Sequence, residues 1–142
     1  MKLNGTKEES QKPSARIEEI LRHYKSPFAD MIGIRIDRLA ESYCKLRLLL
    51  EEKCLNSFGL VHGGVLATMA DMCMGVALRT AGLKSLTVEL TVNFLSKPDT
   101  GDELTAEGWI VYRGNTIALT ECIIKSGNDK DVARGRGIFK IS

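Results

Sequence analysis

The sequence predicts an α+β domain in which an antiparallel sheet wraps around one long central helix. Residues 63–78 are apolar or small except for Thr68 and Asp71, which predicts a helix that is buried on all sides. This run is shorter than the ~20 apolar residues that span a bilayer, so protein has to surround it. Segments before and after it alternate apolar and polar residues, as half-buried strands do. A sheet that buries such a helix has to curl about it.

Size and composition set the broad class. The 142 residues contain no obvious linker, which predicts one main domain with a proper core. The charged fraction of 27% and the net charge of +2 are ordinary for a globular protein and give no support for nucleic-acid binding. The four cysteines lack CxxC spacing and a neighbouring His cluster, which favours buried free thiols over disulfides or a metal site. Because the first thirty residues are polar, we expect no secretory signal, no membrane span and a cytoplasmic protein.

Residues 1–27 are expected to form a flexible leader and a short helix ahead of a main domain over residues 28–142. Ser14 is suited to cap this helix, whose apolar residues follow helical spacing. Ser26-Pro27 is predicted to end it, because the residue before a proline avoids the helical conformation. The element is expected to pack as a flap on the main domain.

Alternation predicts the strands. In chain order they are residues 31–39, 44–50, 86–94, 104–112 and 116–125, followed by a last strand near the C-terminal end. A turn near Glu41-Ser42 joins the first two into a hairpin with one dry face. In the last strand Ala133, Gly135 and Gly137 share a face with Phe139, so small residues would let the sheet come close to a bulky element lying across it.

Asp71 is the one acid of the predicted buried helix, and an isolated carboxylate in such surroundings needs a partner, water or a chemical role. Gly63 and Gly64 lie at the N-terminus of the helix, where free N–H groups and the positive end of the helix dipole favour an oxyanion. At ~1.5 Å per residue, Asp71 lies ~12 Å along the axis from Gly63, too far to serve a carbonyl held there. Either the two features are unrelated, or a second copy in a two-fold dimer with antiparallel central helices supplies Asp71. By itself, Asp71 also fits a buried acid satisfied by hydrogen bonds.

A motif around the start of the helix narrows these alternatives. It reads Asn56-x-x-Gly59-x-x-His62-Gly63-Gly64, with Asp71 seven residues beyond Gly64. The motif resembles the signature of the hotdog-fold acyl-CoA thioesterases, of the phenylacetate-degradation and thioesterase-superfamily type. The resemblance extends from about residue 28 to residue 141. It implies a hotdog fold and an enzyme that hydrolyses an acyl- or aryl-CoA thioester to the free acid and coenzyme A, with no metal and no cofactor.

The resemblance also implies roles for individual residues. The backbone N–H of Gly63 would hold the thioester carbonyl as an oxyanion hole, with Gly64 helping to open the helix end. Asp71 of the other subunit would act as general base on water or attack directly as a nucleophile.

Three further residues would support this centre. Asn56 would orient the water or the thioester, His62 would steady Asn56 or the substrate, and Thr87 would help to position the acid. The resemblance implies a homodimer whose sheets join edge to edge through residues 86–94, and a dimer of dimers is a further option.

Coenzyme A carries phosphates, so basic side chains are expected around the mouth of the site. The candidates by position are Lys97, Arg113, Arg134 and Arg136, although each also fits a solvated surface charge. Two other functions remain open, namely a catalytically silent acyl-CoA-binding domain and an enoyl-CoA hydratase of the same fold. The sequence lacks the Asp-x-Asn-Pro-x-His arrangement expected of such hydratases, and it also lacks a Gly-x-Ser-x-Gly elbow, a P-loop and a metal-ligand cluster.

Overall fold

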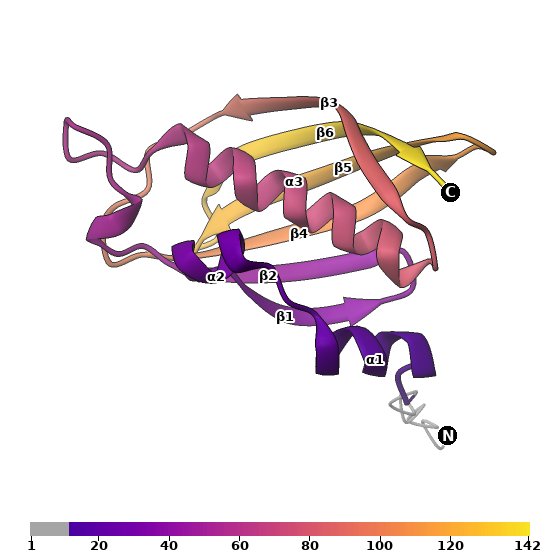
Figure 1. Cartoon of the computed structure of the whole chain (residues 1–142). Helices are drawn as coiled ribbons and strands as arrows, with labels where there is room; N and C mark the ends of the chain where they lie inside the picture. Colours follow the sequence, from indigo (N-terminus) through magenta and orange to yellow (C-terminus); the bar gives the residue numbers. More distant parts are fainter. Residues whose placement is uncertain (1–11) are drawn as a thin grey trace, which may run out of the picture.

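The computed structural model describes residues 12–142. Its elements in chain order are α1 (Ala15–His23), α2 (Pro27–Ile32), β1 (Arg35–Ala40), β2 (Tyr43–Leu49), the short 3₁₀ helix η1 (Glu52–Cys54), α3 (Gly63–Thr80), β3 (Ser85–Phe94), β4 (Glu103–Arg113), β5 (Ile117–Ser126) and β6 (Asp131–Ile141). Figure 1 shows α3 lying across the curved sheet, with α1 and α2 beside it. The predicted leader lies mostly outside the described residues.

The six strands form one antiparallel sheet in the order β1-β2-β4-β5-β6-β3. Helix α3 contacts every strand of this sheet, while α1 and α2 pack against α3, and α1 also contacts β1. The predicted fold class, an antiparallel sheet wrapped around one long central helix, is therefore confirmed. The strands β2, β4, β5 and β6 also occur where alternation placed them, and the predicted turn at Glu41-Ser42 joins β1 to β2.

Close helix-to-sheet contact explains the small residues of β6. A Cβ atom added to Gly135 would lie 2.6 Å from the Cys122 sulfur and 3.2 Å from the Ala70 Cβ in α3. Met69 and Met74 of α3 are fully buried in the same layer. A Cβ at Gly135 would crowd Ala70 of α3 as well as Cys122 of β5, so the prediction that small residues let a bulky element lie close to the sheet is confirmed.

The segment before β1 differs from the prediction. Met31 and Ile32 were expected to begin a strand, but they end α2, and β1 starts only at Arg35. Ser26 caps α2 by accepting a hydrogen bond from Ala29 N at 3.4 Å, and Pro27 occupies the first turn. Gly33 closes the helix in the left-handed conformation with φ of 100°. Ser26-Pro27 therefore starts a second helix, whereas α1 ends earlier, at His23.

Strand β3 lies at one edge of the sheet and pairs with β6 on one side. On the other side of β3, no strand of the described chain pairs with it. Its pairing with β6 shifts by one residue between Thr87 and Glu89, which marks a β-bulge. Thr87 pairs with Phe139 and Leu90 pairs with Gly137, so Thr87 and Leu90 face α3 together. Strict alternation along residues 86–94 had placed these two residues on opposite faces.

The four cysteines are buried and free, as expected. Within residues 12–142, no helix is long and apolar enough to cross a membrane.

Candidate active site

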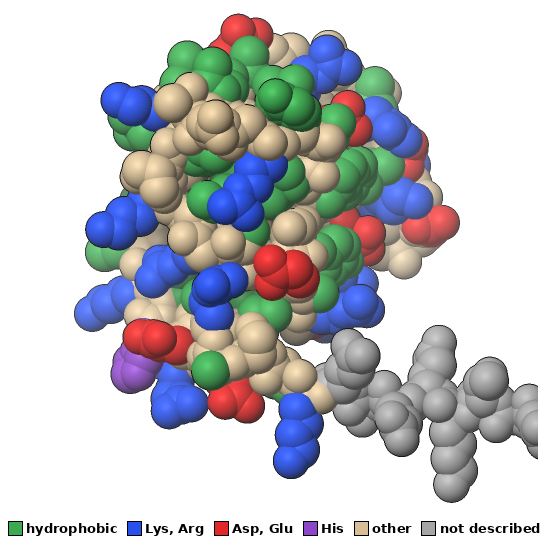
Figure 2. Space-filling view, turned by 90° about the vertical axis from the view of Figure 1, so that its right-hand side faces the viewer, with side chains coloured by type: hydrophobic (Ala, Val, Ile, Leu, Met, Phe, Trp, Pro, Cys, Tyr) green, Lys and Arg blue, Asp and Glu red, His purple; other side chains and the backbone are tan. Residues whose placement is uncertain are grey.

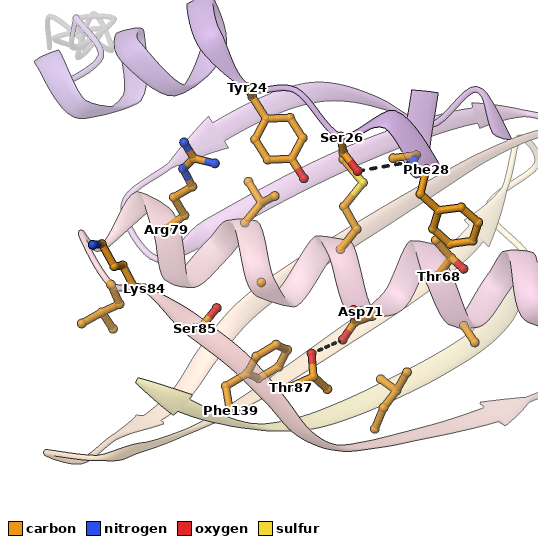
Figure 3. A pocket seen from close by; sticks show the side chains of 17 residues that line it. Tyr24, Ser26, Phe28, Thr68, Asp71, Arg79, Lys84, Ser85, Thr87 and Phe139 are labelled. Carbon is orange, nitrogen blue, oxygen red and sulfur yellow. Dashed lines mark hydrogen bonds between the residues drawn. The ribbon is translucent and has the colours of Figure 1, made fainter. Parts of the chain in front are cut away.

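A cavity of about 850 Å³ opens beside the middle of α3. One wall is α3, and a second is the start of β3 with Phe139 of β6. The third consists of the connection between α1 and α2 and the first turn of α2. Asp71 and Thr87 lie at the centre of this arrangement in Figure 3, where the side chains of Tyr24 and Phe28 approach from the N-terminal helices. The predicted flap therefore contributes directly to the walls of the cavity.

Thr87 holds the carboxylate of Asp71. The Thr87 hydroxyl donates a hydrogen bond of 2.7 Å to Asp71 Oδ1, drawn as a dashed line in Figure 3. Within residues 12–142, no hydrogen bond to Asp71 Oδ2 is found. Asp71 is partly exposed, so this carboxylate is fixed through one oxygen and open to the cavity through the other. Such an arrangement suits a group that acts on a bound molecule.

The N-terminus of α3 presents one available amide. His62 is the N-cap residue, and its Nδ1 accepts a hydrogen bond of 2.8 Å from Gly64 N. Among the hydrogen bonds of residues 12–142, none is donated by Gly63 N. Gly64 is thus occupied by the cap, and the Gly63 amide is left for an acceptor outside the helix.

Asn56 shapes the loop before α3. Its Oδ1 accepts hydrogen bonds from Phe58 N at 2.9 Å and Leu60 N at 3.1 Å. The left-handed Gly59, with φ of 73°, completes this tight turn. The Asn56 carbonyl oxygen is therefore engaged with backbone, and the described chain contains no hydrogen bond between Asn56 and His62.

The expected basic residues do not meet Asp71. Lys97, Arg113, Arg134 and Arg136 are absent from the walls of the cavity. Arg134 and Arg136 line a separate depression on the other face of the sheet, where Trp109 and Glu121 also lie. The basic residues that reach the Asp71 cavity are Arg79, in the last turn of α3, and Lys84, just before β3.

Sequence reasoning missed Arg79 because the predicted helix ended at residue 78. A signal was present, since Asp71, Gly75 and Arg79 recur every four residues and so lie along one side of the helix. Tyr24 was also missed as a wall residue. Its ring lies 5.4 Å from the Arg79 guanidinium, in a cation–π contact. Burial raises the pKa of Tyr24, while the Arg79 charge opposes the shift.

The Gly63 N–H could polarise a bound carbonyl group and the Asp71 carboxylate could act on it, but the two groups lie apart within one chain. Helix α3 runs without interruption from Gly63 to Thr80. The rise of ~1.5 Å per residue therefore places Asp71 ~12 Å from Gly63 along the axis. Within residues 12–142, no group of three or more His, Cys, Asp and Glu side chains is arranged to hold a metal ion.

Comparison with known proteins gives a consistent result. Residues 58–133 match the model of the Thioesterase superfamily. The chain is 28% identical to acyl-coenzyme A thioesterase PaaI of Escherichia coli over 77% of this chain and 78% of that protein. The solved structure of E. coli PaaI superposes with a TM-score of 0.80 at 25% identity, over 88% of this chain and 89% of that chain. The sheet and its central helix are therefore a hotdog fold.

Two further proteins extend the comparison. Acyl-coenzyme A thioesterase 13 of Pongo abelii is 26% identical over 66% of this chain and 67% of that protein. A crystal structure of a hypothetical thioesterase protein with coenzyme A, from Streptococcus pneumoniae TIGR4, matches with a TM-score of 0.75 at 23% identity, over 78% of this chain and 86% of that chain. At 23% identity, the match to the Streptococcus pneumoniae structure shows a shared fold alone.

Proposed function

The chain belongs to the thioesterase superfamily, and we propose that it is an acyl-CoA thioesterase whose reaction centre combines Asp71 of one subunit with Gly63 of another. The observation that carries the proposal is the Asp71 carboxylate, which Thr87 holds at 2.7 Å and which opens onto a cavity of about 850 Å³. The acyl-CoA thioesterase names of the relatives and the coenzyme A in a structural neighbour support this substrate class.

The exposed edge of β3 supports the homodimer. This strand has 10 residues, and Leu86 and Val88 are 70% and 65% exposed. A long, apolar edge strand is a template for pairing with another chain. Two β3 strands that pair antiparallel about a two-fold axis would lay the two α3 helices antiparallel. Each Asp71 then approaches the other subunit's Gly63.

The proposed reaction begins when the thioester carbonyl accepts a hydrogen bond from the Gly63 N–H at the positive end of the helix dipole. If Asp71 is the base, it removes a proton from water, and the water oxygen forms a bond to the carbonyl carbon. The tetrahedral oxyanion then collapses, the C–S bond breaks, and the proton reaches the leaving thiolate of coenzyme A.

If Asp71 is the nucleophile, its oxygen forms an anhydride with the acyl group as the C–S bond breaks, and water then hydrolyses the anhydride. Either path restores the Asp71 carboxylate.

The remaining residues have supporting roles in this proposal. Thr87 positions Asp71, and His62 positions the helix end by capping Gly64. Asn56 shapes the loop and keeps its side-chain nitrogen for water or the thioester. Lys97, Arg113, Arg134 and Arg136 stay predictions as contacts of the coenzyme A phosphates, and a dimer of dimers stays a prediction as well.

Mixing two inactive variants tests the shared site. Asp71→Asn removes the acid and keeps its shape. Gly63→Pro removes the N–H at the first helical position, where proline is well tolerated. Each variant alone should lose thiol release from acyl-CoA by a factor of at least about 100.

Refolding the two variants together in equal amounts makes half of the dimers mixed, and each mixed dimer contains one intact site. About a quarter of the wild-type activity should therefore return. Failure of the mixture to regain activity, with dimers present, would contradict a shared site. Full activity of Asp71→Asn would contradict the thioesterase mechanism, and stoichiometric acyl-CoA binding without thiol release by the wild type would favour a binding domain.

A further inference from the structure

The Asp71 cavity continues along α3 and ends beside positive charge. Arg79 follows Asp71 by eight residues, which corresponds to ~12 Å along the helix axis. Arg79 and Lys84 both line the cavity at this end. Within residues 12–142, neither side chain forms an ion pair. Figure 2 views the molecule from this end and shows basic side chains spread over the surface with hydrophobic ones between them.

The passage between Asp71 and Arg79 is lined mostly by apolar side chains, with the hydroxyls of Ser26 and Ser85 beside them. Its walls include Met72 and Val76 of α3, Leu83 of the following loop and Phe139 of β6. These side chains offer no hydrogen bond to a bound molecule. A ligand that fills the passage therefore gains by placing hydrocarbon between the two polar ends.

Tyr24 adds a hydrogen-bond donor near the cationic end. In Figure 3 its hydroxyl points into the cavity above α3, and the Arg79 guanidinium lies close to its ring. The Tyr24 hydroxyl keeps its proton at neutral pH and can donate, because its ordinary pKa is 10.0 and burial raises that pKa further. Arg79, Lys84 and Tyr24 all line the cavity, and Asp71 is the one carboxylate among the described residues that line it, so the Arg79 end suits an anionic acceptor.

We propose that this end of the cavity recognises a carboxylate at the far end of the acyl group, so that the enzyme prefers ω-carboxyacyl-CoA esters over plain alkanoyl-CoA esters. This inference rests on the proposed thioesterase function. The helix rise places the Cα atoms of Asp71 and Arg79 ~12 Å apart along the axis, which suits a short acyl chain between the two side chains. A six-carbon chain, which spans about 6 Å at about 1.2 Å per bond, is therefore the length chosen for the test.

The same cations would also suit a phosphate of coenzyme A, but the passage argues for the acyl group. The pantetheine arm carries two amides, which need hydrogen-bond partners when buried. Met72 and Val76 supply none on the route from Asp71 to Arg79, and of the two serines that also line the cavity, Ser26 already caps α2 and only Ser85 is left. A methylene chain has no such requirement.

The test compares adipoyl-CoA with hexanoyl-CoA, which have equal chain length and differ in the terminal carboxylate. The wild-type kcat/KM should favour adipoyl-CoA by about tenfold or more, because a charged hydrogen-bonded pair contributes on that scale. Arg79→Met should lower kcat/KM for adipoyl-CoA by about tenfold and change that for hexanoyl-CoA by less than about twofold. Arg79→Lys should keep part of the preference, since it retains the charge but loses the planar fork.

A matched control is Arg22→Met, which removes an exposed arginine of α1 that does not line the cavity. It should leave both substrates unaffected. An equal loss for the two substrates in Arg79→Met would mean that Arg79 holds coenzyme A, and this would overturn the proposal. Equal wild-type activity on the two substrates would overturn it as well.

Calorimetric binding of both esters to the Asp71→Asn protein separates this inference from the proposed function. A binding preference for adipoyl-CoA that Arg79→Met abolishes would support carboxylate recognition even if the wild type released no thiol. Equal affinity for the two esters would overturn carboxylate recognition while leaving thioester hydrolysis standing.

Discussion

Replacing Thr87 with Val removes the hydroxyl that holds Asp71 and keeps the β-branched shape of the side chain. The lost contact is a hydrogen bond of 2.7 Å to a carboxylate. Hydrogen bonds to charged groups contribute about 1.5–3 kcal/mol. Because both side chains are accessible to solvent, the lower end of this range applies, and about 1.4 kcal/mol corresponds to tenfold in rate. Thr87→Val should therefore lower kcat by about tenfold.

Steady-state thiol release across an acyl-CoA series measures this effect. KM should change by less than about twofold, because Thr87 acts through Asp71 rather than on the bound substrate. Thr87→Ser keeps the hydroxyl and should recover kcat to within about threefold of the wild type. The thermal midpoints should agree, since Val suits an edge strand. An unchanged kcat in Thr87→Val, or an equal loss in Thr87→Ser, would refute the positioning role.

Three further predictions concern assembly, packing and pH. Val88→Lys places a charge on the exposed edge of β3, so sedimentation should show monomers and thiol release should fall with the dimer; an active monomer would contradict the shared site. Gly108→Ala should lower the free energy of unfolding by about 1–3 kcal/mol, measured in urea, because the new Cβ would lie 2.9 Å from the Cys73 backbone; an unchanged midpoint would disprove the close contact. Burial raises the pKa of Cys122 from 9.0 to about 12, so the unfolded thiol ionises first. Stability should hold below pH 9.0 and fall toward pH 12, with a shallower fall in Cys122→Ala.

The first segments show where local sequence signals competed. Alternation of Ile32, Ile34 and Ile36 suggested a strand from residue 31, but Ser26, Pro27 and Gly33 are a helix cap, a first-turn proline and a helix stop. The backbone hydrogen bonds and caps of a short helix outweighed a pattern that was real only from Ile34 onward. Both sets of residues were visible in the sequence, and the cap signals were the stronger guide.

Part of the candidate site could be predicted from the sequence. Asp71, Gly63 and His62 follow a motif of fixed spacing within one helix, and helix geometry turns spacing into distance. The pairing of Thr87 with Asp71 was expected from the resemblance, and the structure joins the two residues at 2.7 Å. The basic residues expected near the site were chosen by position alone, and none of them lines the cavity.

The sequence by itself determined the long apolar helix and the antiparallel strands, because periodicity and spacing are local properties of the chain. The prediction that this helix is buried on all sides was wrong, since the side with Asp71 and Arg79 lines an open cavity. Only the tertiary structure decided which distant side chains meet Asp71. A single-residue bulge in β3 turns Thr87 toward α3, and strict alternation cannot reveal such a shift. The folding of α1 and α2 against α3 likewise brings Tyr24 to Arg79 across more than fifty residues of chain, and this contact depends on packing rather than on local pattern.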